Sequence, residues 1–247
     1  MKKFSGLLLL FLACQGFNEE KAIEDITNLI DAQDRNWFVI PEIMEDSTNQ
    51  DSIRWWRNPE NEERIIGISF AQAETAYVEV EYSLSGRFIY YPTDTLREET
   101  PLKEKMRIKA VYIREEEGWR LKDISPIEFL SDTLISPFAN LFWIKLKDKT
   151  LTPDTLFPID SLPSFDKGED IEIRAKTTLD TMQCIVFLYT DNRKGLTPTD
   201  KDIWHGSFKA PSSPGIYKFT IYTINLKTLS GNWPYDANGW TIWYQVN

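Results

Sequence analysis

Hydrophobic and polar residues alternate along several stretches of this chain, and this alternation predicts β-strands with one buried and one solvent-facing side. In "TAYVEVEYSLSGRFIYYP", residues 75–92, the apolar side carries Val78, Val80, Tyr82 and Leu84. In "KEKMRIKAVYIREEEGWRLKDIS", residues 103–125, that side carries Met106, Ile108 and Ala110. The run "ERIIGISFA" precedes both, so the pattern predicts a meander of long strands in the first half of the chain.

Before these strands, apolar residues recur with the period of an α-helix. In "EEKAIEDITNLIDAQDRNW", residues 19–37, apolar Ile23, Ile26, Ile30 and Trp37 recur at close to helical spacing, with acidic residues between them. Such spacing predicts an amphipathic helix that packs its apolar side on another element. A further pair, Trp55 and Trp56, is adjacent on a strand and points to opposite faces, so one of the two indoles should be partly exposed.

The last strands of the meander form a hairpin pattern, "VYIREEEGWRLKDIS", in which an apolar strand leads through a charged turn with Gly118 to Trp119 and a second alternating strand. A helix followed by such a meander resembles the nuclear transport factor 2-like (cystatin-like, SnoaL-like) family. The resemblance covers residues 19–127 and implies an α+β cone-like domain around a pocket. Some members of that family are isomerases, dehydratases or hydrolases that use an Asp/His or Asp/Tyr pair, whereas the single histidine of this chain is His205.

Two carboxylates in the predicted meander, Glu79 and Glu81, leave two interpretations open. As an acid and base pair they would serve a small-molecule enzyme, provided that burial in the cone pocket separated their pKa values. Alternatively they face the lysines and arginine of residues 105–109 on the solvent side of the sheet, in a charge ladder whose pairs contribute about 0.2–1 kcal/mol each. We favour the ladder, because carboxylates are seldom fully buried.

Prolines are concentrated between residues 126 and 163, where five of the thirteen occur. Because the residue before a proline avoids helical geometry, we interpret residues 128–139 as a linker. About seven short strands separated by turns follow, and they predict an all-β immunoglobulin-like sandwich over residues 140–247. The segment "PSSPGIYKFTIY" resembles the turn and strand of many bacterial immunoglobulin-like modules.

Aromatic residues near the C-terminus are the candidate ligand-binding residues of this second domain. Alternation places Trp240, Ile242, Tyr244 and Val246 on the core face and leaves Trp243 on the other, and similarly leaves Tyr222 beside Lys218. The loop "SGNWPYDANG" adds Trp233 and Tyr235. The stretch "GNWPYDANGWTIWY" distantly resembles the end of starch-binding-type carbohydrate-binding modules. Exposed rings would stack on sugars. We favour the alternative that Trp243 and Tyr222 pack against the first domain or a loop, because isolated surface aromatics are normal.

The N-terminus has the layout of a secretory signal, with two lysines, a short apolar run and a small residue before Cys14. The run is shorter than the roughly 20 apolar residues that span a bilayer. The segment "FLAC" resembles the lipobox of bacterial lipoproteins, which implies a signal peptide over residues 1–14, lipidation of Cys14 and a lipid-anchored location in the bacterial cell envelope, at the outer membrane or cell surface. The membrane, through this lipid, is therefore an expected partner, and a glycan or another envelope protein is a further candidate.

Composition narrows the function classes. The 38 acidic residues outnumber the 28 lysines and arginines, which argues against nucleic acid as a partner. Two cysteines and one histidine favour neither a metal site nor a disulfide framework, and we expect no cofactor and no catalytic residues. The sequence therefore predicts a non-enzymatic binding or scaffold module of the cell envelope. Its alternatives are a carbohydrate-binding surface lipoprotein and an enzyme with a carboxylate in the cone pocket.

Overall fold

The computed structural model describes residues 17–33, 37–38, 54–93, 96–132, 139–190, 193–231 and 233–247. Lipidation of Cys14 and the signal peptide concern residues outside these ranges and stay predictions. The first half of the chain forms one helix and five strands: α1 (Glu19–Gln33), β1 (Arg54–Gln72), β2 (Thr75–Thr93), β3 (Leu96–Glu115), β4 (Gly118–Ile124) and β5 (Ile127–Ser131).

The second half is built from shorter strands, as its spaced turn residues predict. These are β6 (Leu141–Leu146), β7 (Lys149–Leu151), β8 (Phe157–Pro158), β9 (Ser164–Phe165), β10 (Asp170–Thr177), β11 (Cys184–Tyr189), β12 (Arg193–Gly195), β13 (Thr197–Asp200), β14 (Ile203–Lys209), β15 (Gly215–Asn225) and β16 (Ala237–Val246). A 3₁₀ turn, η1 (Ile159–Ser161), follows β8, and a short helix, α2 (Leu226–Leu229), follows β15.

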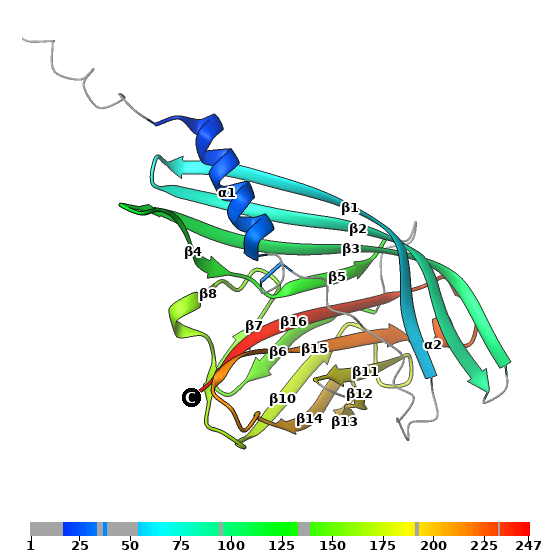
Figure 1. The fold of residues 1–247 in the computed structure, drawn as a ribbon. Helices are drawn as coiled ribbons and strands as arrows, with labels where there is room; N and C mark the ends of the chain where they lie inside the picture. The colour runs from blue at the N-terminus through cyan, green and yellow to red at the C-terminus, as the bar shows by residue number, and fades with distance from the viewer. Residues whose placement is uncertain are drawn as a thin grey trace, which may run out of the picture.

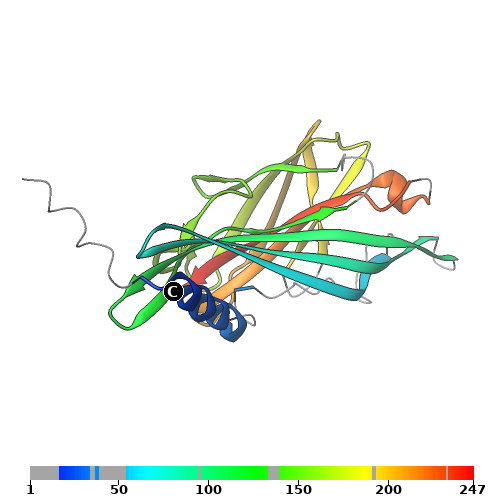
Figure 2. The same cartoon turned by 90° about the horizontal axis from the view of Figure 1, so that it is seen from above.

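The fold is mostly β, with two sheets. An 11-stranded sheet has the main order β1-β2-β3-β5-β16-β15-β11-β12, with β4, β8 and β9 joined at its sides. A five-stranded sheet has the order β13-β14-β10-β6-β7. In Figure 1 the long strands β1, β2 and β3 run side by side across the top of the molecule and bend at one end toward α2. Figure 2 shows that α1 and the C-terminus lie at the opposite end from α2.

The two halves of the chain meet along β5. Strand β3 pairs with β4 over Ala110–Glu115 and with β5 over Glu104–Arg107, so β4 and β5 follow one another along the same edge. Strand β5 in turn pairs with β16, residues 127–130 with residues 238–241. The prediction of a linker over residues 128–139 is therefore wrong at its start, because these residues form a strand. Pro126 lies at the break between β4 and β5, where a proline is tolerated.

Period-two alternation predicted the core face of β16 correctly. Trp240, Ile242, Tyr244 and Val246 are all buried. The opposing sheet contributes further buried residues, Ile171, Ile173 and Ala175 of β10 and Trp204 of β14. The buried apolar residues of both halves form one contiguous cluster. The two halves of the chain thus share a core as well as a sheet.

The predicted helix forms, although it is shorter than its apolar spacing suggests. α1 ends at Gln33, so Trp37 lies beyond the helix in a turn. Ile26 and Ile30 are buried as expected, but the prediction for Ile23 is wrong: it is 38% exposed and Ala22 takes the buried position. The helix lies on the long strands, where its Asp31 pairs with Arg64 of β1, and the ring of Phe17, just before the helix, lies 5.1 Å from that of Phe70.

The bent ends of the long strands lie against the second half of the chain. Trp55, near the start of β1, is fully buried and stacks on Tyr222 of β15 with 5.4 Å between ring centres. Its ring also lies 5.4 Å from that of Phe187 on β11. The neighbouring Trp56 points the other way and is only partly buried, as the strand period requires. The 11-stranded sheet therefore curls until its first strand contacts its seventh.

Candidate functional site

The structure distributes the four predicted ligand-binding aromatics over three places. Tyr222 and Tyr235 come together in the interior, 0% and 1% exposed. Trp243 lies at the other end of the β15–β16 pair and is 4% exposed, and Trp233 is half-buried near α2 with the Lys227 ammonium 5.2 Å from its ring centre. The row of exposed rings does not form, and the favoured alternative is confirmed for Tyr222 and Trp243. Trp55 packs on Tyr222 and Trp37 packs on Trp243. Phe88 of β2 likewise lies against Tyr235.

Tyr222 and Tyr235 belong to a buried polar group that we call the Glu104 cluster, with Arg57 and Glu104 as its other members. The hydroxyls of Tyr222 and Tyr235 each donate to Glu104 Oε1 at 2.8 Å and contact one another. Arg57 pairs with the other carboxylate oxygen and lies 5.2 Å from the ring centre of Phe129. The cluster joins β1, β3, β15 and the loop before β16, which are the elements that meet where the sheet curls.

Burial dominates the electrostatics of the Glu104 cluster. Desolvation raises the pKa of Glu104, and the Arg57 charge and the Tyr222 hydroxyl oppose that shift only in part. Desolvation, followed by the nearby Glu104 charge, raises the pKa of Tyr222 well above its ordinary value. A carboxyl group held by an arginine and two hydroxyls in a closed interior is equipped to fix the packing of the strands around it, because each removed partner would leave a buried charge unsatisfied.

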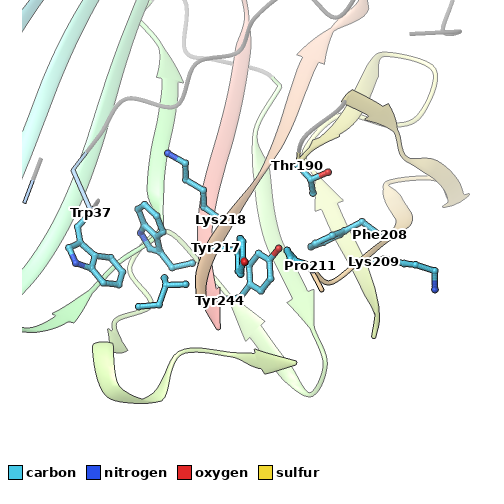
Figure 3. Close-up of a pocket in the computed structure, with 10 residues that line it drawn as sticks. Trp37, Thr190, Phe208, Lys209, Pro211, Tyr217, Lys218 and Tyr244 are labelled. Carbon is cyan, nitrogen blue, oxygen red and sulfur yellow. The ribbon is translucent and has the colours of Figure 1, made fainter. Parts of the chain in front are cut away.

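A groove of about 830 Å³, which we call the β15 groove, lies along the free part of β15. It opens where the pairing of β11 with β15 stops, at Tyr189 and Thr220, so that residues 215–219 of β15 continue beyond the end of β11. Its aromatic lining consists of Trp37, Phe208, Tyr217, Trp243 and Tyr244. Figure 3 shows Trp37 at one end of this lining and Phe208 toward the other, with Tyr217 and Tyr244 between them.

Strand register explains why these rings converge. Lys218 pairs with Trp243 and Tyr217 with Tyr244 across β15 and β16, so the two cross-strand pairs present rings on both faces of the hairpin. Trp37 packs edge-on against Trp243 at 5.1 Å between ring centres. On the opposite face, the ring of Tyr244 lies 5.9 Å from that of Tyr217 and 5.8 Å from that of Phe208. Trp37, Tyr217 and Phe208 are the partly accessible members.

Polar groups in the β15 groove are few and are mostly hydrogen-bond donors. The ammonium groups are those of Lys209 and Lys218, and the Lys218 nitrogen lies 5.6 Å from the ring centre of Trp243. Lys209 pairs with Asp170 at 2.9 Å. Tyr217 donates its hydroxyl to the carbonyl of Ser213. Aromatic rings with a few placed polar groups are a usual composition of a ligand site.

Glu79 and Glu81 lie on the outer face of the sheet, in the charge ladder that the alternation favours. Lys105 approaches Glu81 at 3.5 Å, and Arg107 approaches Glu79 at 3.8 Å and Glu128 at 2.6 Å. Both carboxylates are substantially exposed. The condition that an enzyme would require of this pair, burial in an inward-facing pocket, is therefore not met at these two residues.

Cys184 and His205, the other residues that could take part in catalysis, lie in surroundings that are typical of residues with a structural role. The Cys184 thiol is buried, and desolvation raises its pKa, which disfavours the reactive thiolate. His205 lies half-buried on β14, opposite Arg174 and Thr197 in the neighbouring strands. Within the described ranges, no three His, Cys, Asp or Glu side chains gather in a way that could hold a metal ion.

Arg57 and Glu104 are functional-site residues that the sequence patterns did not predict, and the proximity of Trp37 and Phe208 to β16 was likewise not predicted. A signal for Glu104 was present, because it follows the spacing of Met106 and Ile108 and so falls on the apolar face of β3. Trp37 and Phe208 had no comparable signal, since their proximity to β16 depends on tertiary packing.

Comparisons with protein families, curated proteins and solved structures found no match for this chain. Over the part of the chain that the structure describes, no helix combines the length and apolar character needed to cross a membrane.

Proposed function

We propose that this protein is a non-enzymatic binding module whose ligand occupies the β15 groove. The observation that carries the proposal is the convergence of five aromatic residues, from three separate parts of the chain, on one open groove of about 830 Å³. That volume lies within the range of about 300–1,000 Å³ that is usual for ligand sites. The lining favours binding over catalysis, because its described residues include no carboxylate, histidine or cysteine that would act as acid, base or nucleophile.

A carbohydrate is the ligand class that the aromatic lining favours. The partly accessible rings of Trp37, Tyr217 and Phe208 offer flat surfaces for the apolar C–H faces of sugars, while Lys218 and Thr190 offer hydrogen bonds to hydroxyls. Trp243, one of the residues chosen from sequence, would then act beneath Trp37 as part of the groove wall. Tyr222 and Tyr235 would contribute indirectly, by fixing the sheet that carries the groove.

We propose further that the protein is exported and anchored in the bacterial cell envelope by a lipid on Cys14, at the outer membrane or cell surface. The support is the order of lysines, apolar run and cysteine at the N-terminus. An anchored protein with a glycan groove would hold polysaccharide, or a glycan-bearing envelope protein, close to the membrane.

The finer fold assignment is also a proposal: a nuclear transport factor 2-like unit over residues 19–127 and an immunoglobulin-like unit over residues 140–247. Strand order supports the second unit. If β6, β10, β11, β13, β14, β15 and β16 correspond to strands A to G, the two sheets read A-B-E-D and C-F-G, which is the order of a constant-type immunoglobulin sandwich. The packing of α1 on long antiparallel strands supports the first unit.

The test is a binding screen of the purified protein against polysaccharides and peptidoglycan. We expect binding that is lost in Trp37→Ala and in Tyr217→Ala, both of which remove a ring from the groove. Trp56→Ala is the matched control, because this indole is also half-buried but lies on β1, remote from the lining residues. Unchanged binding in both groove variants, or no binding by the natural protein, would overturn the proposal.

A further inference from the structure

We infer that the edge of β1 at residues 65–70 is an interface at which a second copy of this chain adds its own β1 in antiparallel pairing. None of the described lining residues of the β15 groove belongs to β1, and the inference does not depend on a ligand there. Three observations carry it: the composition of this edge, the self-complementary order of its residues, and an exposed apolar residue on α1.

Strand β1 is the first strand of the 11-stranded sheet, and among the described residues it pairs with β2 alone. Its other edge therefore presents backbone N–H and C=O groups to which a further strand can bind. Such edges are usually protected by proline or by charged side chains. Residues 59–64, "PENEER", have this protection, whereas residues 65–70, "IIGISF", contain neither a proline nor a charged residue. An unprotected edge of this composition favours the addition of another strand.

The order of apolar residues along this edge suits pairing with an identical strand. Two antiparallel copies can meet with Gly67 opposite Gly67 of the second copy, which sets Ile66 opposite Ile68 on both sides of a two-fold axis. Ile66 and Ile68 are half-buried and share one face of β1. The pairing would therefore continue the apolar inner face of the sheet from one copy into the other.

The charged residues of β1 fit the same register. Glu62 and Glu63 fall opposite residues 71–72 of the second copy, an alanine and a glutamine, so carboxylates do not oppose one another. Arg64 falls opposite Phe70, where a guanidinium can lie over an aromatic ring. The strand thus opposes its own copy without placing like charges against each other over residues 62–72.

Helix α1 places an exposed apolar residue near this interface. It crosses the long strands obliquely (Figure 1), and its Asp31 pairs with Arg64, so the side of the helix that carries Asp31 faces β1. Residues four apart share one side of a helix, so Thr27 and Ile23 lie on this side too. The Ile23 side chain is 38% exposed. A two-fold axis through the paired strands keeps both helices on the same face of the sheet, where the second copy would help to remove Ile23 from water.

The first test is the oligomeric state by sedimentation equilibrium. The protein is the mature chain from residue 14 with Cys14→Ser, so that neither a lipid nor this thiol joins two copies. We expect a dimer that dissociates on dilution. Gly67→Glu should weaken this dimer by about fivefold or more, because two carboxylates would then face each other across the axis, each opposite Glu79 in its own copy.

Gly67→Gln is the matched control, since it adds a side chain of the same length without the charge. Position 67 is exposed and has room for a Cβ, so both variants should fold, which circular dichroism verifies. The glutamine variant should dimerise as the natural chain does. A chain that stays monomeric over the whole concentration range would overturn the inference, and so would equal association of the two variants.

The register is tested by disulfide formation in the same Cys14→Ser chain. Gly67→Cys should give a disulfide-linked dimer under mild oxidation, because residues directly opposite in an antiparallel pair have Cα atoms about 4.5–5.5 Å apart, within the range of a disulfide. Ser69→Cys is the control, since it is exposed on the same face but falls opposite Ile65 of the second copy. The native Cys184 is buried and does not compete. Linkage of Ser69→Cys as readily as of Gly67→Cys, or of neither, would contradict pairing about Gly67.

Discussion

Arg57 and Glu104 form an ion pair in the interior, with side chains 2% and 0% exposed, and this pair holds the first strand of the sheet against the third where the sheet curls. Two tyrosine hydroxyls complete the coordination of the carboxylate. Burying such a pair is costly, and replacing both partners by apolar residues is often neutral, so its presence indicates a role in specifying one arrangement of strands. The first two predictions test this role.

Arg57→Met should destabilise the protein, and more strongly at high pH than at low pH. Removing one partner of a buried ion pair costs about 3–5 kcal/mol when the remaining charge stays ionised. Burial already raises the pKa of Glu104. A carboxyl group whose pKa is raised on folding contributes most to stability below its ordinary pKa, and that contribution is lost as pH rises through the folded value. The deficit should therefore be larger at about pH 8 than at about pH 5, measured by urea unfolding.

The control for this measurement is Arg87→Met, which removes an exposed arginine from its pairs with Glu60 and Glu99. Water stabilises those carboxylates when the arginine is absent, so we expect little change at either pH. A loss in Arg57→Met that was the same at both pH values would show that Glu104 does not control the packing through its charge.

Tyr222→Phe should lower the free energy of unfolding by about 1.5–3 kcal/mol, the range for a hydrogen bond to a charged group. The change keeps the ring, which stacks on Trp55, and removes only the hydroxyl that donates to Glu104. Tyr217→Phe is the matched variant, because its hydroxyl donates to the carbonyl of Ser213 at an exposed site. Equal effects of the two variants in chemical denaturation would contradict the importance of the Glu104 cluster.

Gly86→Ala should destabilise the pairing of β1 with β2, whereas Gly67→Ala should be tolerated. A Cβ at Gly86 would collide with the carbonyl of Asn58 and lie 2.9 Å from Pro59 Cα, at the irregularity in the β1–β2 register. The cost of such overpacking is typically about 1–3 kcal/mol. At Gly67 the nearest atom would be 3.7 Å away, an ordinary contact. The measurement is the thermal unfolding midpoint of both variants. A Gly86→Ala protein as stable as the natural one would show that β1 and β2 can move apart at Gly86 at little cost.

The natural protein should unfold in one cooperative transition despite its two predicted domains. Strand β5 hydrogen-bonds to β3 on one side and to β16 on the other, and the buried residues of both halves are contiguous. Tryptophan fluorescence and far-UV circular dichroism should therefore give coincident curves in denaturant. Two separated transitions would instead indicate that each half is stable alone and that β5 joins them only weakly.

Sequence patterns predicted much of the local structure. Alternation identified the long strands, the shared face of Lys218 and Tyr222, and the solvent-side charge ladder of Glu79 and Glu81. These properties depend on neighbours along one strand or across one hairpin, and residues two apart reveal them. Alternation could not decide between exposure and packing of Tyr222, Tyr235 and Trp243, for a related reason. Period two tells which residues share a face, and a residue far away in sequence decides whether that face is covered.

The boundary after residue 127 shows the same limit. Proline enrichment near Pro126 indicated a linker, yet the proline marks the point where the chain passes from one neighbouring strand to the next along β3. The β15 groove could not be predicted from the sequence for the same physical reason, because tertiary packing alone brings Trp37 and Phe208 to it. Glu104 alone carried a readable signal, an acidic residue in the apolar register of its strand.

The curl of the sheet also affects how quickly the protein reaches its native state. Tyr222 and Tyr235 are separated from Glu104, their hydrogen-bond partner, by 118 and 131 residues of sequence. The cluster therefore forms only when very long loops have closed. Contacts of this separation slow folding, since the entropy of closure is lost before the contact contributes. Until that step, Arg57 and Glu104 stay hydrated and the faces of β1 and β15 are open to other chains. We therefore expect formation of the cluster to be a slow step, during which the open strands are sensitive to aggregation.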